Sequence, residues 1–192
     1  MCRWDSFSSR HAFTLLGYSR MVIPVRTLVK RTSVAAVIAA GIFAAAPLVA
    51  QDLGIEVGAR APAVTVHTVD GKPVDLGQYI GKTPMLIEFW ATWCPNCREL
   101  MPTLLDAEKK YGKRVKFVAL AVAINQSPER VRRFLAAHPF PHDTFYDTDG
   151  KAAGAFDAPA TSYVVVLDKT GKVVYTGLGG KQNLDAALKK AL

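Results

Sequence analysis

The segment EFWATWCPNC, residues 88–97, decides both the fold and the chemistry of this chain of 192 residues. It continues the apolar run at 85–87 and ends in Cys94 and Cys97, which have two residues between them. A nearly continuous apolar run of this length is typical of a strand in the centre of a sheet. Beyond it, apolar residues recur at helical spacing as far as Gly112. The two cysteines therefore stand between a buried strand and a helix.

This position gives Cys94 a specific chemistry. The first turn of a helix presents unpaired backbone N–H groups and the positive end of the helix dipole. A thiolate at that place is stabilised, so the thiol becomes a nucleophile near neutral pH. Cys97, one turn further along, is placed to attack a mixed disulfide formed at Cys94. Pro95 suits the first turn because it needs no N–H there. We predict a pair that cycles between thiol and disulfide.

An acidic residue, Glu88, lies within the apolar run. The alternation of the strand puts its side chain on a buried face, six residues before Cys94. Burial raises the pKa of a carboxyl group, which can then exchange a proton near neutrality. We expect Glu88 to take the proton from Cys97 when that thiol attacks. The alternative is a carboxyl group that reaches solvent at the edge of the strand.

The rest of the pattern alternates strands and helices. It predicts further strands at 64–69, 73–76, 115–124, 161–168 and 173–177, and helices from 128 and from 183. The stretch 138–156 is predicted to be a loop that leads into a short helical turn. Such an order predicts an α/β domain in which helices cover a mixed sheet.

The first fifty residues differ from the rest. They hold six basic residues and one acid, followed by an alanine-rich apolar stretch that closes on Ala50. This pattern predicts a signal peptide cut after Ala50, or an N-terminal anchor that is retained. Residues 51–192 then form one domain. Most of the net charge of +8 lies in the leader. Without a dense basic cluster in residues 51–192, we expect no nucleic-acid partner.

The motif EFWATWCPNC, followed by RELMP, resembles the active-site region of the thioredoxin superfamily. The longer stretch APAVTVHTVDGKPVDLGQYIGKTPMLIEFWATWC is similar to exported TlpA/ResA-type thiol–disulfide oxidoreductases, and the similarity runs over residues 58–192. It implies a thioredoxin-like mixed sheet flanked by helices, with an extra N-terminal β-hairpin, in a domain that spans 51–192. It also implies that Trp93, Pro95 and Asn96 belong to a surface where partners dock.

The resemblance also implies a function. Such proteins exchange thiols and disulfides with protein clients, and the family suggests a reductant that serves cytochrome c maturation or the assembly of a metal site. It implies export to the bacterial periplasm or envelope and recharging by a membrane electron donor. The membrane would be a partner of the chain itself only if the N-terminal segment is retained. We expect no cofactor and no resident metal.

One feature of the superfamily is not matched cleanly. A cis-proline is expected just before the strand that precedes the last hairpin, facing the disulfide. The candidate is Pro159, but it lies about three residues too far from the turn at Gly171. Counted at the usual spacing, Ser162 takes that place.

Other functions for the cysteines are possible. His138 and His142 would complete a zinc site, but they lie about forty residues away, far beyond the linker of a zinc finger. A copper-delivery module with Cys94 and Cys97 as ligands is the main alternative function. A purely structural disulfide would close a very small loop and add little stability. Peroxidase chemistry needs a threonine three residues before the nucleophile, whereas Thr92 is two before Cys94.

Overall fold

The computed structural model describes residues 53–192. The predicted signal peptide or anchor at 1–50 lies outside the described residues. In the part that is described, no helix is both long enough and apolar enough to cross a membrane.

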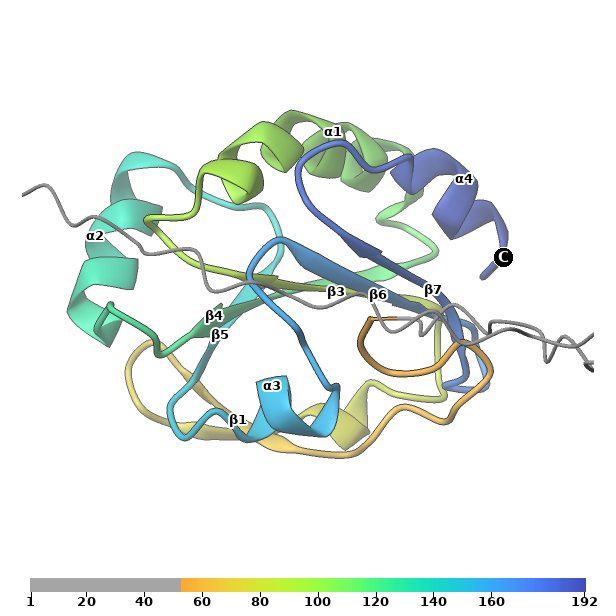
Figure 1. Cartoon of the computed structure of the whole chain (residues 1–192), viewed down its shortest axis with the longest axis horizontal. Coiled ribbons are helices and arrows are strands. Elements are labelled where there is room, and N and C mark those ends of the chain that lie inside the picture. The colour runs from red at the N-terminus through yellow and green to blue at the C-terminus, as the bar shows by residue number, and fades with distance from the viewer. Residues whose placement is uncertain (1–52) are drawn as a thin grey trace, which may run out of the picture. The chain divides into compact units, whose positions relative to one another are not determined.

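A single mixed sheet organises the described residues, in the order β2-β1-β5-β4-β3-β6-β7 (Figure 1). Its strands are β1 (Thr65–Thr68), β2 (Pro73–Asp75), β3 (Met85–Trp90), β4 (Lys116–Val122), β5 (Asp143–Asp147), β6 (Tyr163–Leu167) and β7 (Val173–Leu178). The three strands β3, β4 and β5 run parallel, and all other pairs are antiparallel. β3 pairs on both edges, with β4 and with β6, and all six of its residues are buried, five of them apolar and one the acidic Glu88.

The helices begin where the sequence provides capping residues. They are the short 3₁₀ helix η2 (Leu76–Gln78), α1 (Pro95–Tyr111), α2 (Pro128–Ala137), α3 (Lys151–Ala155) and α4 (Leu184–Lys189). Ser127 caps α2 by accepting a hydrogen bond from the N–H of Arg130 at 3.3 Å, and Pro128 takes the first position. Asn183 caps α4 in the same way through the N–H of Ala186.

The helices cover the sheet in two layers. Figure 1 shows α1 and α4 over one face of the sheet and α3 beneath the other. Leucines of α1 and α4 pack there on β3 and β6; the members are Leu86, Leu100, Leu104, Val164, Val166, Leu184 and Leu188. The connections β3–α1–β4 and β4–α2–β5 move in the same direction across the sheet, so right-handed crossovers put α2 beside α1.

The fold agrees with the sequence analysis in its class and differs in one strand. The mixed sheet, its covering helices and the N-terminal hairpin β1–β2 are confirmed. The stretch 138–156 was predicted to be a loop that leads into a short helical turn. The turn is confirmed as α3, but the loop prediction was wrong for Asp143–Asp147, because β5 forms there between β1 and β4. The aspartates at both ends of β5 make this segment look like a polar loop in the sequence. Asp147 is nevertheless buried, since its carboxylate accepts hydrogen bonds from the N–H groups of Ala152 and Ala153 at the start of α3.

Candidate active site

The strand β3 delivers the two cysteines to the start of α1. All six residues of the strand are buried, so its path is fixed by its neighbours on both sides. A tight turn follows, closed by the N–H of Cys94 donating to the carbonyl oxygen of Ala91 at 3.1 Å. The helix then begins at Pro95, where the missing N–H leaves no donor unpaired.

Cys94 is the N-cap of α1. Its Sγ accepts a hydrogen bond from the N–H of Cys97 at 3.1 Å and is bonded to the Sγ of Cys97 in a disulfide. The two Cα atoms are 5.3 Å apart, within the ordinary range for a disulfide. Both residues are buried, with Cys94 only 2% exposed. The sulfur of Cys94 thus lies where helix N–H groups and the helix dipole favour negative charge.

Glu88 is completely buried, and neither oxygen of its carboxyl group has a hydrogen-bond partner among the described residues. Burial raises the pKa of this group from 4.5 to about 8. Its strand position opposite Val164 puts it on the face of the sheet that α1 and α4 cover. The alternative in which the carboxyl group reaches solvent is wrong. Glu88 can both accept and release a proton near neutral pH.

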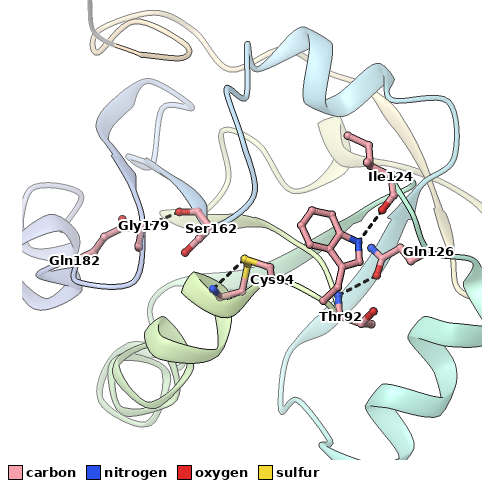
Figure 2. Close-up of a disulfide and its surroundings, with 9 residues drawn as sticks. Thr92, Cys94, Ile124, Gln126, Ser162, Gly179 and Gln182 are labelled. Atoms are coloured by element: carbon pink, nitrogen blue, oxygen red, sulfur yellow. Dashed lines mark hydrogen bonds between the residues drawn. A yellow bond between two sulfur atoms is a disulfide. The ribbon is translucent and has the colours of Figure 1, made fainter. Parts of the chain in front are cut away.

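A set of polar contacts fixes the turn before Cys94 (Figure 2). The indole N–H of Trp93 donates to the carbonyl oxygen of Ile124 at 2.8 Å, and the N–H of Thr92 donates to Oε1 of Gln126 at 2.9 Å. Nε of Arg130 donates to the hydroxyl of Thr92 at 3.0 Å. We call Thr92, Gln126 and Arg130 the turn clamp. Sequence reasoning missed it, because its partners are more than thirty residues apart.

Ser162 borders the site at the start of β6. Its N–H donates to the carbonyl oxygen of Phe89 at 2.8 Å, and its own carbonyl oxygen accepts from the N–H of Gly179 at 3.0 Å and from Nε2 of Gln182 at 3.1 Å. Its φ is +62°, a left-handed conformation that is uncommon for a residue with a side chain. Ser162, and not Pro159, therefore immediately precedes the strand, as the count back from Gly171 indicated.

An apolar pocket lies beside the turn and brings two predicted docking residues together. It has a volume of about 350 Å³ and is lined by Trp93, Val122, Ile124, Ala153, Ala158, Pro159, Ala160 and Thr161. Trp93 is 36% exposed and Ile124 is 62% exposed. Pro95 and Asn96 are exposed in the first turn of α1. Residues 53–192 contain no cis peptide bond, so Pro159 lacks the cis bond that the resemblance implied.

The two histidines considered as metal ligands take part in other contacts. Nδ1 of His142 lies 2.7 Å from a carboxylate oxygen of Glu108, and the ring of His138 stacks on Phe134 with centroids 4.7 Å apart. Within residues 53–192, no three side chains of His, Cys, Asp or Glu gather into a group that could hold a metal ion.

Known proteins resemble this chain in sequence and in structure. Residues 56–192 match the Redoxin family. The thioredoxin-like protein YneN of Bacillus subtilis is 29% identical over 72% of this chain and 82% of its own length. A thiol-disulfide oxidoreductase ResA of Bacillus thuringiensis subsp. konkukian is 30% identical over 71% of this chain and 79% of its own length.

A solved structure agrees with these relatives. The crystal structure of a thiol:disulfide interchange protein of the thioredoxin family from Chlorobium tepidum superposes with a TM-score of 0.58 at 25% identity, covering 70% of this chain and 96% of that one. The fold, the cysteine pair at the start of α1 and these relatives agree. The chain belongs to the Redoxin family and is a thiol–disulfide oxidoreductase of the TlpA/ResA type within the thioredoxin superfamily.

Proposed function

We propose that this protein is an exported reductant of protein disulfides, with Cys94 as the attacking cysteine and Cys97 as the resolving one. The observation that carries the proposal is the hydrogen bond from the N–H of Cys97 to the Sγ of Cys94 at the N-terminus of α1. This contact favours a thiolate at Cys94 once the disulfide is reduced. Cys97 has no equivalent place, since it lies inside the first turn.

The first step forms a bond between the protein and its client. The thiolate of Cys94 attacks one sulfur of a client disulfide, and a mixed disulfide forms while the other client sulfur leaves as a thiolate. Because Cys94 is only 2% exposed in the disulfide form, neighbouring side chains have to move before a client sulfur can approach in line.

The second step releases the client. Cys97 loses its proton to Glu88 and attacks the Sγ of Cys94, so that the disulfide between the two cysteines re-forms and the second client sulfur leaves as a thiolate. Two electrons have then passed from the protein to the client. The burial of Glu88 supports its role, because a carboxyl group with a pKa of about 8 is partly ionised near neutral pH.

The apolar pocket beside Trp93 supports docking of an extended apolar client segment. Trp93 and Pro159 line this pocket, while Pro95 and Asn96 are exposed in the adjacent turn of α1. A client cysteine flanked by apolar residues would bury those neighbours here, whereas a charged segment would lose solvation. The residues between the cysteines, Pro95 and Asn96, would then tune both the contact and the reduction potential.

The proposed direction of electron flow rests on the resemblance to TlpA/ResA-type proteins, and the proposed place of action rests on the leader sequence. The relatives named thiol-disulfide oxidoreductase ResA support the exchange chemistry. The family resemblance adds to the proposal a reductant in the envelope, of the kind used in cytochrome c maturation or metal-site assembly, recharged by a membrane electron donor. The basic, alanine-rich residues 1–50 support export, either as a soluble protein after cleavage or as an anchored one. Clients are therefore proteins with a dithiol or disulfide that is exposed outside the cytoplasm.

A trapping experiment tests the roles of the two cysteines. The Cys97→Ser variant is expected to accumulate a mixed disulfide through Cys94 with an oxidised client such as insulin, because nothing resolves it. The Cys94→Ser variant is expected to trap nothing and to lose insulin reduction. Mass spectrometry of the alkylated products identifies the bonded cysteine. A client captured through Cys97 in Cys94→Ser, at the rate seen for Cys94, would contradict the proposal.

A further inference from the structure

The hydroxyl of Ser162 is buried and has no hydrogen-bond partner among the described residues. Both backbone polar groups of Ser162, in contrast, are bonded: the N–H to the carbonyl oxygen of Phe89, and the carbonyl oxygen to Gly179 and Gln182. These hydrogen bonds fix the backbone of Ser162, while its side-chain hydroxyl has no hydrogen-bond partner among the described residues. A buried polar group without a partner costs stability and calls for an explanation.

The place of Ser162 is the end of the sheet from which the cysteines emerge. Tyr163 pairs with Phe89, so Ser162 lies beside the end of β3. That strand ends at Trp90, four residues before Cys94 in the chain. In Figure 2, Ser162 is drawn on the side of Cys94 that faces Gly179 and Gln182, whereas Thr92 and Gln126 are drawn on its other side. The structure thus puts an unused donor at the redox centre.

The partner of this donor depends on the redox state. A disulfide sulfur is a weak, neutral acceptor, whereas a thiolate is charged and accepts hydrogen bonds strongly. We propose that the Ser162 hydroxyl is a redox-dependent positioning group: it bonds nothing beside the disulfide and donates to the Cys94 thiolate in the reduced protein. This inference rests on the proposed role of Cys94 as the nucleophile.

The consequence is a shift of the redox equilibrium. Two molecules of glutathione reduce the disulfide to the dithiol form and become one glutathione disulfide, and the Cys94 thiol then releases its proton to solvent and becomes a thiolate. A donor that bonds only the thiolate stabilises the reduced protein and not the oxidised one. The Ser162 hydroxyl therefore raises the fraction of reduced protein at a given glutathione ratio and increases the thiolate fraction of Cys94.

Other titratable groups surround the same place and remain unchanged when Ser162 is replaced. They are Glu88 on β3, Cys97 on α1, Glu99 beside Gly180, and Tyr175, whose hydroxyl donates to Oε1 of Gln182 at 3.2 Å. A negative charge on Glu88 or Glu99 opposes the thiolate in every variant alike. Differences between Ser162 variants therefore report the hydroxyl itself.

The test compares Ser162→Ala with the wild-type protein by two readouts. In reduced protein, the pH dependence of Cys94 alkylation is expected to move upward by about one unit, a roughly tenfold loss of thiolate. The equilibrium with glutathione is expected to shift about tenfold toward the disulfide. Ser162→Thr keeps a hydroxyl and should restore both values. Ser162→Gly lacks the hydroxyl but relieves the left-handed backbone, so it should match Ser162→Ala.

Thr144 on β5 provides the matched control, since its hydroxyl is also buried without a partner, three strands away from β6. Thr144→Val should leave both readouts unchanged. Wild-type values in Ser162→Ala, or an equal shift in Thr144→Val, would overturn the inference. A shift in Ser162→Gly alone would assign the effect to the backbone and overturn it too. If wild-type Cys94 shows no thiolate near neutral pH, the proposed nucleophile fails, and that failure is visible before any Ser162 variant is compared.

Discussion

The N–H of Cys97 donates a hydrogen bond to the Sγ of Cys94 at 3.1 Å, so Cys97 acts on Cys94 through its backbone as well as through the disulfide. This contact, with the helix dipole, stabilises charge on Cys94 alone. We predict that Cys94 in Cys97→Ser titrates well below the ordinary thiol value of about 8.5, whereas Cys97 in Cys94→Ser does not. The pH dependence of alkylation measures both. Equal pKa values would show that the helix terminus does not distinguish the two thiols.

The buried carboxyl group of Glu88 makes stability depend on pH. Its pKa is raised in the folded protein, from 4.5 to about 8, so the folded state keeps a proton that the unfolded state releases. The stability that this bound proton contributes is therefore complete at a pH below 4.5, the pKa of the unfolded state, and is lost as the pH rises through about 8, the pKa of the folded state. We expect the free energy of unfolding to fall between these values by up to about 1.4 kcal/mol per pH unit. Urea unfolding across this range measures the slope.

Glu88→Gln is the matched variant for this effect, because it keeps the shape and removes the titration. The slope should disappear in Glu88→Gln, and the variant should exceed the wild-type protein in stability at the alkaline end. The same variant should also release trapped clients more slowly, since Cys97 loses its proton acceptor. A wild-type slope that survives in Glu88→Gln would assign the pH dependence to other groups.

Apolar docking beside Trp93 predicts a selective effect on clients. Ile124 lines the pocket and is 62% exposed, so Ile124→Ser removes apolar contact surface without disturbing the core. We expect a several-fold higher KM for a peptide disulfide with apolar flanking residues, and an unchanged reduction potential. Leu178→Ser on β7 is the control, because Leu178 is also exposed but does not line this pocket. An equal KM for both variants would show that the pocket does not take part in client docking.

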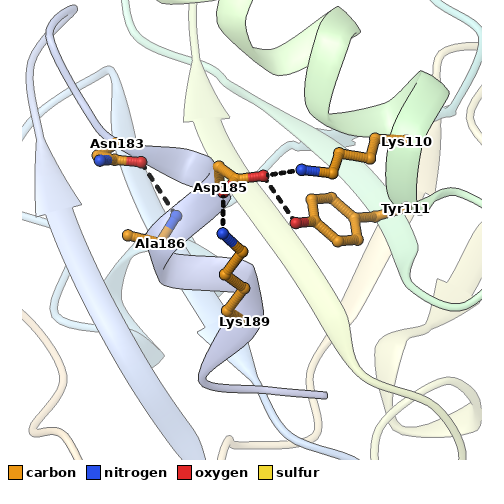
Figure 3. Close-up of polar contacts among 6 residues, drawn as sticks. All are labelled: Lys110, Tyr111, Asn183, Asp185, Ala186 and Lys189. Carbon is orange, nitrogen blue, oxygen red and sulfur yellow. Dashed lines mark hydrogen bonds and ion pairs between the residues drawn. The ribbon is translucent and has the colours of Figure 1, made fainter.

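Asp185 links α4 to α1 and predicts a stability effect without a redox effect (Figure 3). Its carboxylate accepts hydrogen bonds from the hydroxyl of Tyr111 at 2.7 Å and from Lys110, and forms an ion pair with Lys189. These contacts, the one with Lys110 first, lower the pKa of Asp185 below its ordinary 3.8. The contribution of Asp185 to the stability of the folded state is thus present above pH 3.8 and is lost as the pH falls through the lowered pKa.

Asp185→Asn should therefore lower Tm at neutral pH, by an amount that shrinks in strong acid and in high salt. Thermal unfolding at several pH values measures this, and insulin reduction should stay at the wild-type rate. A Tm difference that is independent of pH would show that the charge of Asp185 contributes nothing.

The sequence predicted the parts of the site that depend on neighbours along the chain. Cys94, Pro95 and Cys97 are placed by one strand end and one helix start, and a local pattern of apolar and capping residues is enough to locate both. Glu88 was also predictable, because strand alternation puts it on a buried face and no nearby basic residue could pair with it.

The parts that could not be predicted depend on contacts between distant segments. The turn clamp joins Thr92 to Gln126 and Arg130, and no local pattern marks these residues as partners. The strand β5 is stabilised by pairing on both edges, which overrides its polar ends. At the start of β6, the presence of a proline drew attention to Pro159, whereas the spacing from the hairpin turn correctly indicated Ser162.

The reduction potential of the Cys94–Cys97 couple, measured against a glutathione or dithiothreitol buffer, tests the proposed function most directly. A reductant of client disulfides is expected to have a value near that of thioredoxin, about −270 mV, so that electrons flow from the protein to its clients. A value near about −120 mV would make the protein a donor of disulfides and would contradict the proposed direction.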